Sequence, residues 1–268
     1  MFYNAKNEKI EIEDTVVPYI SFGKGKENLI IIPGVGEGFK MVKGVAIPFA
    51  ILYRMFAKDY KVYMFSRREK MPENFSNEDM ANDIIEHMKE LNIEKAHVFG
   101  VSQGGMIAQC LAIKAPEKVD KLVLCVTVAR QNEILEETIN SWKKMAEEKD
   151  YKAIMMDTAE KSYTGEYLEK NRKWFELLGR LSKKKDFTRF LIQAKACLNH
   201  NTYDDLDKIK SKTLIIGAAQ DKALGIEGSR ELAEKIKNSE LHIYEEYSHG
   251  VYEQAKDFNS RVLEFLKK

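Results

Sequence analysis

The chain has 268 residues, with 43 basic and 42 acidic side chains and a formal net charge of +1. This length suits one large domain or a domain with a subdomain, and the near-neutral charge gives no reason to expect nucleic acid or an anionic membrane as a partner. Because no stretch approaches the ~20 apolar residues of a membrane-spanning helix, and the first residues lack an apolar signal core, we expect a cytoplasmic protein without stable membrane insertion. The three cysteines fit a reducing compartment, since they are odd in number and far apart: Cys110, Cys125 and Cys197.

The first part of the chain predicts an edge hairpin, a buried strand and a glycine-rich turn. Residues 9–22 alternate between polar and apolar side chains, as antiparallel edge strands do, and residues 28–32 are nearly all apolar, as expected of a strand buried on both faces. The segment Pro33-Gly34-Val35-Gly36-Glu37-Gly38 follows, and its glycines let backbone N–H groups approach an anion closely. A dinucleotide-binding loop is the alternative, but Phe39 stands where that motif needs its third glycine.

Strands and helices then alternate. Residues 61–65 predict a strand, and residues 77–91 predict a helix with Ser76 as its N-cap and Asp79 in its first turn. Residues 96–99 predict the next strand, and residues 103–115 predict a helix that ends before Pro116. This alternation is typical of a mostly parallel sheet covered by helices.

The strongest local motif lies between the last of these strands and its helix. Gly100-Val101-Ser102-Gln103-Gly104 has the Gly-x-Ser-x-Gly pattern of a nucleophile elbow, in the strand–turn–helix context that this motif requires. The tight turn pushes the Ser102 hydroxyl clear of the sheet. It also aims the Gln103 N–H and the helix N-terminus at charge that develops beside Ser102. We expect Ser102 to be a nucleophile, and a glycine-rich turn with an incidental serine is the alternative.

A long segment without strands follows residues 121–126, which predict another strand. Apolar residues at helical spacing continue from about residue 131 to residue 205, so we expect a helical insertion. We predict a core of residues 1–130, a helical cap of residues 131–205, and the rest of the core in residues 206–268. A scaffold extension with no role in binding is the alternative to a cap.

The final part supplies a candidate acid and a candidate base. Asp221 follows the predicted strand 213–216, and His249 follows the predicted strand 241–244, before a closing helix over about 251–268. Both loops return to the sheet edge that holds the elbow, so His249 can serve as the base and Asp221 as the carboxylate that orients it. Glu227 and Asp205 are the alternative acids. The other histidines fit structural or surface roles better: His87, His97, His200 and His242.

An oxyanion hole needs two backbone donors near the nucleophile. The Gln103 N–H is the first. We assign the second to Val35, with Gly34 as the neighbouring possibility.

These segments together resemble the α/β-hydrolase superfamily over nearly the full length of the chain. The resemblance implies an eight-stranded, mostly parallel sheet, a helical cap, a triad without a cofactor, and hydrolysis of the ester or amide type. The chain departs from the family in having Pro33-Gly34 where members often carry His-Gly, and it lacks the His-Gly-Gly-Pro-Gly segment of proline iminopeptidases.

We therefore expect a serine hydrolase, in the esterase and lipase group, that acts on a small acyl substrate, most simply a carboxylic ester. Ser102, Asp221 and His249 are the expected catalytic triad, and neither a metal nor an organic cofactor is required. Hydrolysis of a lactone, an amide or a C–C bond by the same triad is one alternative. Ligand binding without catalysis is another, because a fold does not fix a function. The sequence leaves the oligomeric state open.

Overall fold

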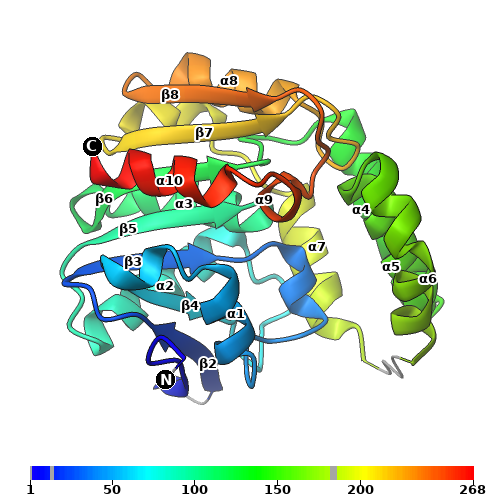
Figure 1. Ribbon diagram of the computed structural model, residues 1–268, viewed down its shortest axis with the longest axis horizontal. Coiled ribbons are helices and arrows are strands. Elements are labelled where there is room, and N and C mark those ends of the chain that lie inside the picture. The colour runs from blue at the N-terminus through cyan, green and yellow to red at the C-terminus, as the bar shows by residue number, and fades with distance from the viewer. Residues whose placement is uncertain (1, 13–14, 182–185) are drawn as a thin grey trace.

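An eight-stranded sheet organises the chain (Figure 1). The structure is a computed structural model that describes residues 2–12, 15–181 and 186–268. The strand order is β1-β2-β4-β3-β5-β6-β7-β8. The β1–β2 and β2–β4 pairs are antiparallel, and the other neighbouring pairs are parallel. The strands are β1 (Lys6–Ile12), β2 (Thr15–Phe22), β3 (Glu27–Ile32), β4 (Tyr60–Phe65), β5 (Ala96–Val101), β6 (Val119–Cys125), β7 (Lys212–Ala218) and β8 (Ser239–Tyr244). The predicted eight-stranded, mostly parallel sheet is confirmed.

Helices cover both faces of the sheet because the central strands are apolar on both sides. In β3, Ile30 and Ile32 pack toward one face, and Leu29 and Ile31 pack toward the other. The first face carries α2 (Asn77–Glu90), α3 (Gln103–Lys114) and α8 (Glu227–Lys235). The second carries α1 (Ala46–Leu52), α9 (Val251–Gln254) and α10 (Phe258–Lys267).

The start of α2 shows how local sequence sets a helix boundary. The Ser76 hydroxyl accepts a hydrogen bond from the Asp79 N–H at 3.1 Å, and the Asp79 carboxylate accepts one from the Ser76 N–H at 2.9 Å. This reciprocal capping box satisfies two backbone donors that the helix itself cannot pair. The predicted N-cap is confirmed.

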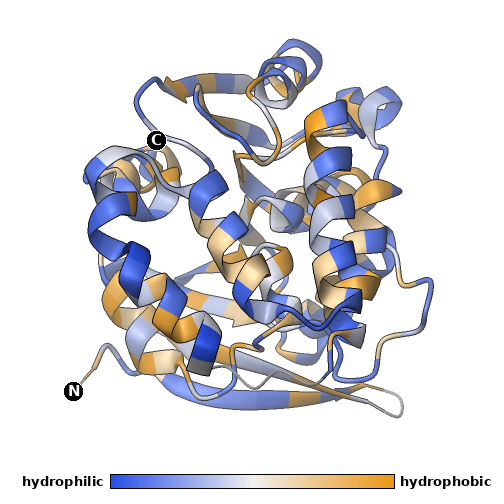
Figure 2. Cartoon of the chain, turned by 90° about the vertical axis from the view of Figure 1, so that its right-hand side faces the viewer, coloured by the Kyte–Doolittle hydropathy of each residue, from blue (hydrophilic) through white to orange (hydrophobic). Residues whose placement is uncertain are grey.

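In the described residues between β6 and β7, four α-helices lie beyond the carboxyl ends of the parallel strands (Figure 1). They are α4 (Glu133–Glu147), α5 (Tyr151–Ser162), α6 (Gly165–Leu181) and α7 (Thr188–Leu198), and we call them the helical insertion. Figure 2 shows hydrophobic and hydrophilic residues alternating along the helices on this side. Leu135, Ile139 and Phe190 form part of a separate apolar cluster that joins the insertion to the core. The insertion falls within the predicted range of residues 131–205.

A single closing helix over about residues 251–268 was expected, but the structure has two helices there. The segment divides into α9 and α10, because Ala255 adopts an extended backbone with ψ of 118°. The break lets both Val251 and Phe258 enter the core against the same sheet face.

All three cysteines are free and buried. None of the helices in the described ranges is both long enough and apolar enough to span a bilayer.

Candidate active site

Ser102 lies at the junction of β5 and α3 in a strained backbone conformation. Its φ of 55° and ψ of −122° place it in a region that residues with a side chain rarely occupy. Such strain costs on the order of 1–3 kcal/mol and persists only where the surrounding structure enforces it. Ser102 is half-buried between buried neighbours, so the turn presents the serine at the edge of the sheet.

Close packing enforces this turn. A Cβ atom on Gly100 would lie 2.4 Å from the Gly104 carbonyl oxygen, and one on Gly104 would lie 1.9 Å from the Ile32 carbonyl oxygen. Neither contact is sterically possible. The two glycines of the motif are therefore required for β5, α3 and β3 to approach one another, as the motif predicts.

Asp221 and His249 form a direct pair in the neighbouring loops. The His249 Nδ1 lies 2.8 Å from the Asp221 Oδ2, and both residues are buried. The other carboxylate oxygen of Asp221 accepts hydrogen bonds from the backbone N–H groups of Ala223 at 2.8 Å and Leu224 at 3.0 Å. These two bonds hold the carboxylate in place beside the His249 ring.

Backbone hydrogen bonds bring the three loops to one sheet edge. The Ser102 N–H donates to the Cys125 carbonyl at 2.9 Å, and the Val126 N–H donates to the Ile216 carbonyl at 2.8 Å. β7 then pairs with β8, which leads to His249. Within the described part of the chain, the Ser102 hydroxyl has no hydrogen-bond partner. The serine–histidine contact of a hydrolase is often long before substrate binds.

The glycine-rich turn after β3 lies beside Ser102. A Cβ atom on Gly34 would be 3.3 Å from the Ser102 Cβ and 3.7 Å from its Oγ. Val35 begins the 3₁₀ helix η1 (Val35–Gly38), and Gln103 begins α3. The first N–H groups of a helix have no acceptor within it, so both are available to an anion.

A buried charge network holds this turn, and the sequence analysis did not find it. The Glu37 carboxylate accepts bonds from the Arg189 guanidinium at 2.8 and 2.9 Å and from the Gln193 amide at 2.9 Å. The Arg67 guanidinium donates to the Pro33 carbonyl at 2.6 Å. Glu37 follows the predicted oxyanion turn, and Arg189 belongs to the helical insertion. The network therefore fixes the turn against α7.

A second network surrounds the side chain of Gln103, which is fully buried. Its amide nitrogen donates to the Asn77 Oδ1 at 3.2 Å and to the Gln193 carbonyl at 3.1 Å. The Asn77 amide donates in turn to the Ala196 carbonyl at 3.1 Å. The start of α3, and with it the Gln103 N–H, is thus tied to α2 and α7.

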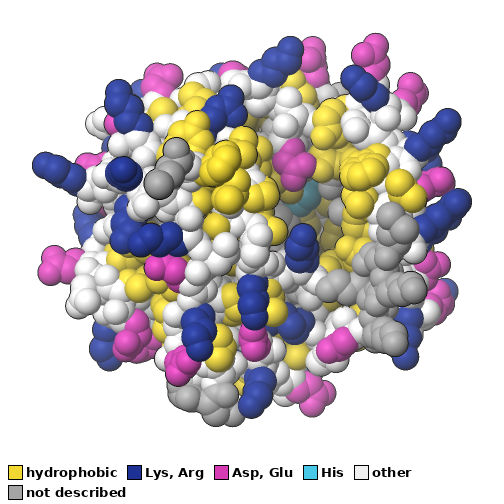
Figure 3. Space-filling view, turned by 60° about the horizontal axis from the view of Figure 1, so that its bottom comes forward, with side chains coloured by type: hydrophobic (Ala, Val, Ile, Leu, Met, Phe, Trp, Pro, Cys, Tyr) yellow, Lys and Arg dark blue, Asp and Glu magenta, His cyan; other side chains and the backbone are white. Residues whose placement is uncertain are grey.

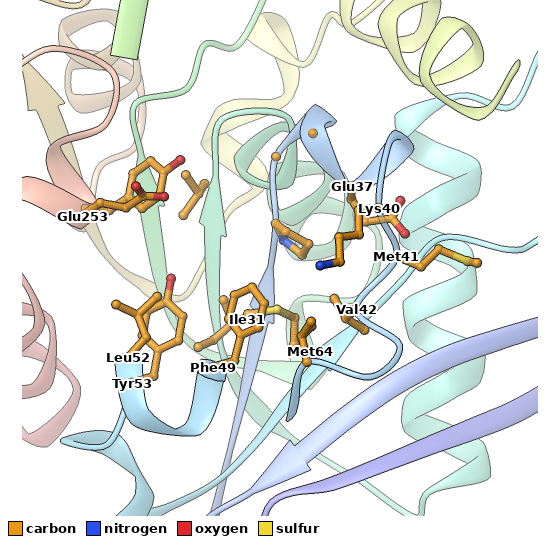
Figure 4. Close-up of a pocket in the computed structure, with 16 residues that line it drawn as sticks. Ile31, Glu37, Lys40, Met41, Val42, Phe49, Leu52, Tyr53, Met64 and Glu253 are labelled. Atoms are coloured by element: carbon orange, nitrogen blue, oxygen red, sulfur yellow. The ribbon is translucent and has the colours of Figure 1, made fainter. Parts of the chain in front are cut away.

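A cavity of about 320 Å³ opens next to the glycine-rich turn (Figure 4). Its floor is apolar and comes from the carboxyl ends of three strands: Ile31, Met64 and Val101. Further apolar side chains come from the segment after η1 and from α1: Met41, Val42, Val45, Phe49 and Leu52. Figure 3 shows a hollow in this protein surface with hydrophobic side chains on both sides and a histidine visible inside it.

The remaining candidates lie elsewhere. Glu227 pairs with Arg230, and Asp205 pairs with Lys208, so neither replaces Asp221 beside His249. His200 is buried and lines a different cavity. His87 is not a surface residue, which was one of the two roles expected for it. Its ring is buried under α2, 4.7 Å from the ring of Phe65, because its helical position faces the sheet.

The family model of the alpha/beta hydrolase fold matches residues 27–256 of the chain. The chain therefore belongs to the alpha/beta hydrolase fold family, and this membership supports hydrolysis of a small molecule. Among the described residues, no three His, Cys, Asp or Glu side chains form a group that could hold a metal ion.

Two of the relatives are distant but cover more than nine-tenths of the chain. The chain is 23% identical to 3-oxoadipate enol-lactonase 2 of Acinetobacter baylyi over 97% of both proteins. It is 25% identical to 2-hydroxy-6-oxononadienedioate/2-hydroxy-6-oxononatrienedioate hydrolase 1 of Pseudomonas putida, over 94% of this chain and 92% of that protein.

Two solved structures show the same fold. An alpha/beta hydrolase enzyme from a Medee basin deep-sea metagenome library, MGS-M2, has a TM-score of 0.86 at 22% identity and covers 97% of this chain and 98% of its own. The enol-lactonase from Burkholderia xenovorans LB400 has a TM-score of 0.82 at 19% identity and covers 97% of this chain and 100% of its own.

Proposed function

We propose that the protein is a serine hydrolase that cleaves a small carboxylic ester through a covalent acyl-enzyme. The observation that supports this most directly is the position of Ser102. It lies on a strained strand–helix turn, at the sheet edge that also holds the buried pair of Asp221 and His249. A serine hydroxyl needs a base to become a useful nucleophile, and a histidine oriented by a carboxylate is such a base.

In the proposed mechanism, Ser102 attacks the carbonyl carbon of the ester while the His249 Nε2 accepts the hydroxyl proton. The Nδ1 of the same ring is bonded to Asp221, so Nε2 is the nitrogen that can receive this proton. The ionised Asp221 carboxylate stabilises the imidazolium that forms and does not itself take the proton. His249 then protonates the departing alcohol. In the second step a water molecule attacks the acyl group, and His249 accepts the proton of this water and returns it to the Ser102 oxygen as the acid leaves.

The negative charge on the carbonyl oxygen needs fixed donors during both steps. The N–H groups of Gln103 and Val35 are the proposed donors, with the Gly34 N–H as the alternative to Val35. The position of Gly34 supports this assignment, because a Cβ atom on Gly34 would lie only 3.7 Å from the Ser102 Oγ. The proposed reaction requires no cofactor.

The cavity of Figure 4 is the proposed acyl site, because Gly34 of the proposed oxyanion turn forms part of its wall. Its apolar floor favours the hydrocarbon part of a substrate. We propose that the helical insertion acts as a cap over this edge of the sheet and that it influences substrate choice. The three free, buried cysteines support the expected cytoplasmic location.

Lactone hydrolysis is the second candidate. Two enol-lactonases, one a sequence relative and one a solved structure, match this chain over nearly its full length. A lactone is a cyclic ester, so the same nucleophile, base and oxyanion donors apply. The two candidates differ in the leaving alcohol, which stays attached to the acyl group when the substrate is a lactone.

A fluorophosphonate probe with a panel of 4-nitrophenyl esters and simple lactones tests the proposal. We expect covalent labelling of the native protein and none of Ser102→Ala, with loss of turnover on the order of 10⁶-fold, as in a nucleophile knockout of another serine hydrolase. Ser260→Ala is the matched control, because this exposed serine bonds only to the Asp257 carbonyl on the surface. Labelling that persists in Ser102→Ala would show that the nucleophile is another residue.

A further inference from the structure

Three side chains in the lining of the proposed acyl cavity carry hydrogen-bond donors. In Figure 4 the Tyr53 hydroxyl and the Lys40 ammonium group both point into the cavity, from different walls. Tyr252 of α9 supplies a third donor to the lining. Among the residues that the structure describes, none accepts a hydrogen bond from these three groups.

The two acidic side chains that line the cavity are already engaged. The Glu37 carboxylate is bonded to Arg189 and Gln193 and lies on the side away from the cavity (Figure 4). Glu253 accepts a hydrogen bond from the Tyr163 hydroxyl. Desolvation raises the pKa of Glu253. Tyr53, Tyr252 and Lys40 therefore remain the side chains of this lining whose donors a ligand can use.

Tyr53 is the most constrained of the donors. Only 4% of its surface is exposed, and its ring packs edge-on against Phe99 at 6.4 Å. Burial raises the pKa of Tyr53, so its hydroxyl keeps its proton and remains a donor at neutral pH. The Tyr53 hydroxyl faces the cavity without an acceptor among the described residues, so a ligand in the cavity can supply one.

We infer that this cavity binds an acyl group that ends in an anionic, acceptor-rich group, and that Tyr53, Tyr252 and Lys40 recognise that end. This inference rests on the proposed function and names its substrate class. The substrates would be esters or lactones of short acids that carry a second carboxylate. The apolar floor of Ile31, Met64 and Val101 would contact the carbons between the two ends. A carboxylate suits the site because it accepts several hydrogen bonds and attracts an ammonium group.

Two matched pairs of chromogenic esters test the inference. Mono-4-nitrophenyl glutarate is compared with 4-nitrophenyl valerate, and mono-4-nitrophenyl adipate with 4-nitrophenyl hexanoate, so that chain length is constant and only the terminal carboxylate differs. The measured quantity is the ratio of kcat/KM for the acid-ended ester to that for the neutral ester. For the native protein we expect a ratio of about 10 or more, since a charge-assisted hydrogen bond is worth roughly 10- to 100-fold.

The variants Tyr53→Phe and Lys40→Gln should each lower this ratio by about tenfold, the range of one such hydrogen bond. Tyr53→Phe removes only the hydroxyl and keeps the ring in place. Lys43→Gln is the control, because this exposed lysine lies on the same segment outside the cavity lining. Its ratio should equal that of the native protein.

A native ratio of 1 or less, or ratios unchanged in both variants, would overturn the inference. A preference for an ester with a terminal amine would instead assign recognition to Glu253, and would also overturn it. Thermal denaturation with added glutarate or adipate separates this test from the proposed function, since it needs no turnover. Stabilisation of native protein but not of Lys40→Gln supports the inference even if no ester is cleaved, and equal or absent stabilisation contradicts it.

Discussion

The Ser248 hydroxyl donates a hydrogen bond to the backbone carbonyl of Lys161 at 2.5 Å. Ser248 precedes His249, whereas Lys161 lies near the end of α5 in the helical insertion. The Gly250 N–H donates to the Ser162 carbonyl at 2.7 Å, so the histidine loop is tied to the insertion on both sides of the ring. Ser248 also accepts a bond from the Lys222 N–H at 3.3 Å, which links it to the loop of Asp221.

Replacing Ser248 with alanine should therefore disturb the placement of His249 without removing a reacting group. We expect Ser248→Ala to lower kcat by about 3- to 10-fold, the range of one neutral hydrogen bond, with a smaller change in KM. Steady-state kinetics with a 4-nitrophenyl ester measures both constants. Thr164→Val is the control, because it removes only the outer bond to the Glu246 carbonyl. An equal effect in both variants would indicate general loosening of the insertion.

Asp221→Asn should keep the fold but lower turnover severely. The amide is nearly isosteric, yet it removes the charge that stabilises the imidazolium and favours the wrong tautomer, a loss of up to ~10⁴-fold in a serine protease. The double variant with His249→Ala should be little worse than His249→Ala alone, since residues that act as a unit are not additive. Rate measurements on the three variants test this. Fully additive losses would mean that Asp221 and His249 act separately.

Glu37→Gln should destabilise the fold because it leaves the largely buried Arg189 without its carboxylate partner. Removing one member of a buried ion pair costs about 3–5 kcal/mol, whereas replacing both members costs much less. The free energy of unfolding from urea titration should therefore be lower in Glu37→Gln than in the double variant Glu37→Leu with Arg189→Met. A double variant as destabilised as Glu37→Gln, or more so, would argue against direct coupling of the pair.

Acid should destabilise the protein through His87. Desolvation, with a smaller contribution from Arg68, lowers the pKa of His87 from 6.5 to about 3. Between these values the unfolded chain binds a proton that the folded chain excludes. The contribution of His87 to the free energy of unfolding is therefore fully present above pH 6.5 and is lost as the pH falls toward 3. The slope for one such group is up to about 1.4 kcal/mol per pH unit. His87→Phe should show a smaller loss of unfolding free energy between pH 7 and pH 5, and an identical loss would contradict the assignment.

The sequence alone predicted the features that local sterics and periodicity determine. The capping box at Ser76 needs only residues three apart, and the elbow at Ser102 needs small residues at Gly100 and Gly104 because strand and helix approach there. Apolar runs predicted the buried strands, because a strand covered on both faces needs apolar side chains on both. Chain order and the common sheet edge also predicted that Asp221 and His249 act together, and in the structure the His249 Nδ1 lies 2.8 Å from the Asp221 Oδ2.

The tertiary structure decided which distant side chains meet. Glu37 and Arg189 are 152 positions apart, and no local pattern in either segment indicates the other. The same holds for Ser248 and Lys161, which are 87 positions apart. Nothing in the local sequence around Tyr53 or Lys40 indicates a role in binding. They become donors to one cavity only when α1 and the turn after β3 fold around the same sheet edge, because direction and burial of a side chain depend on packing between elements rather than on its own neighbours in the chain.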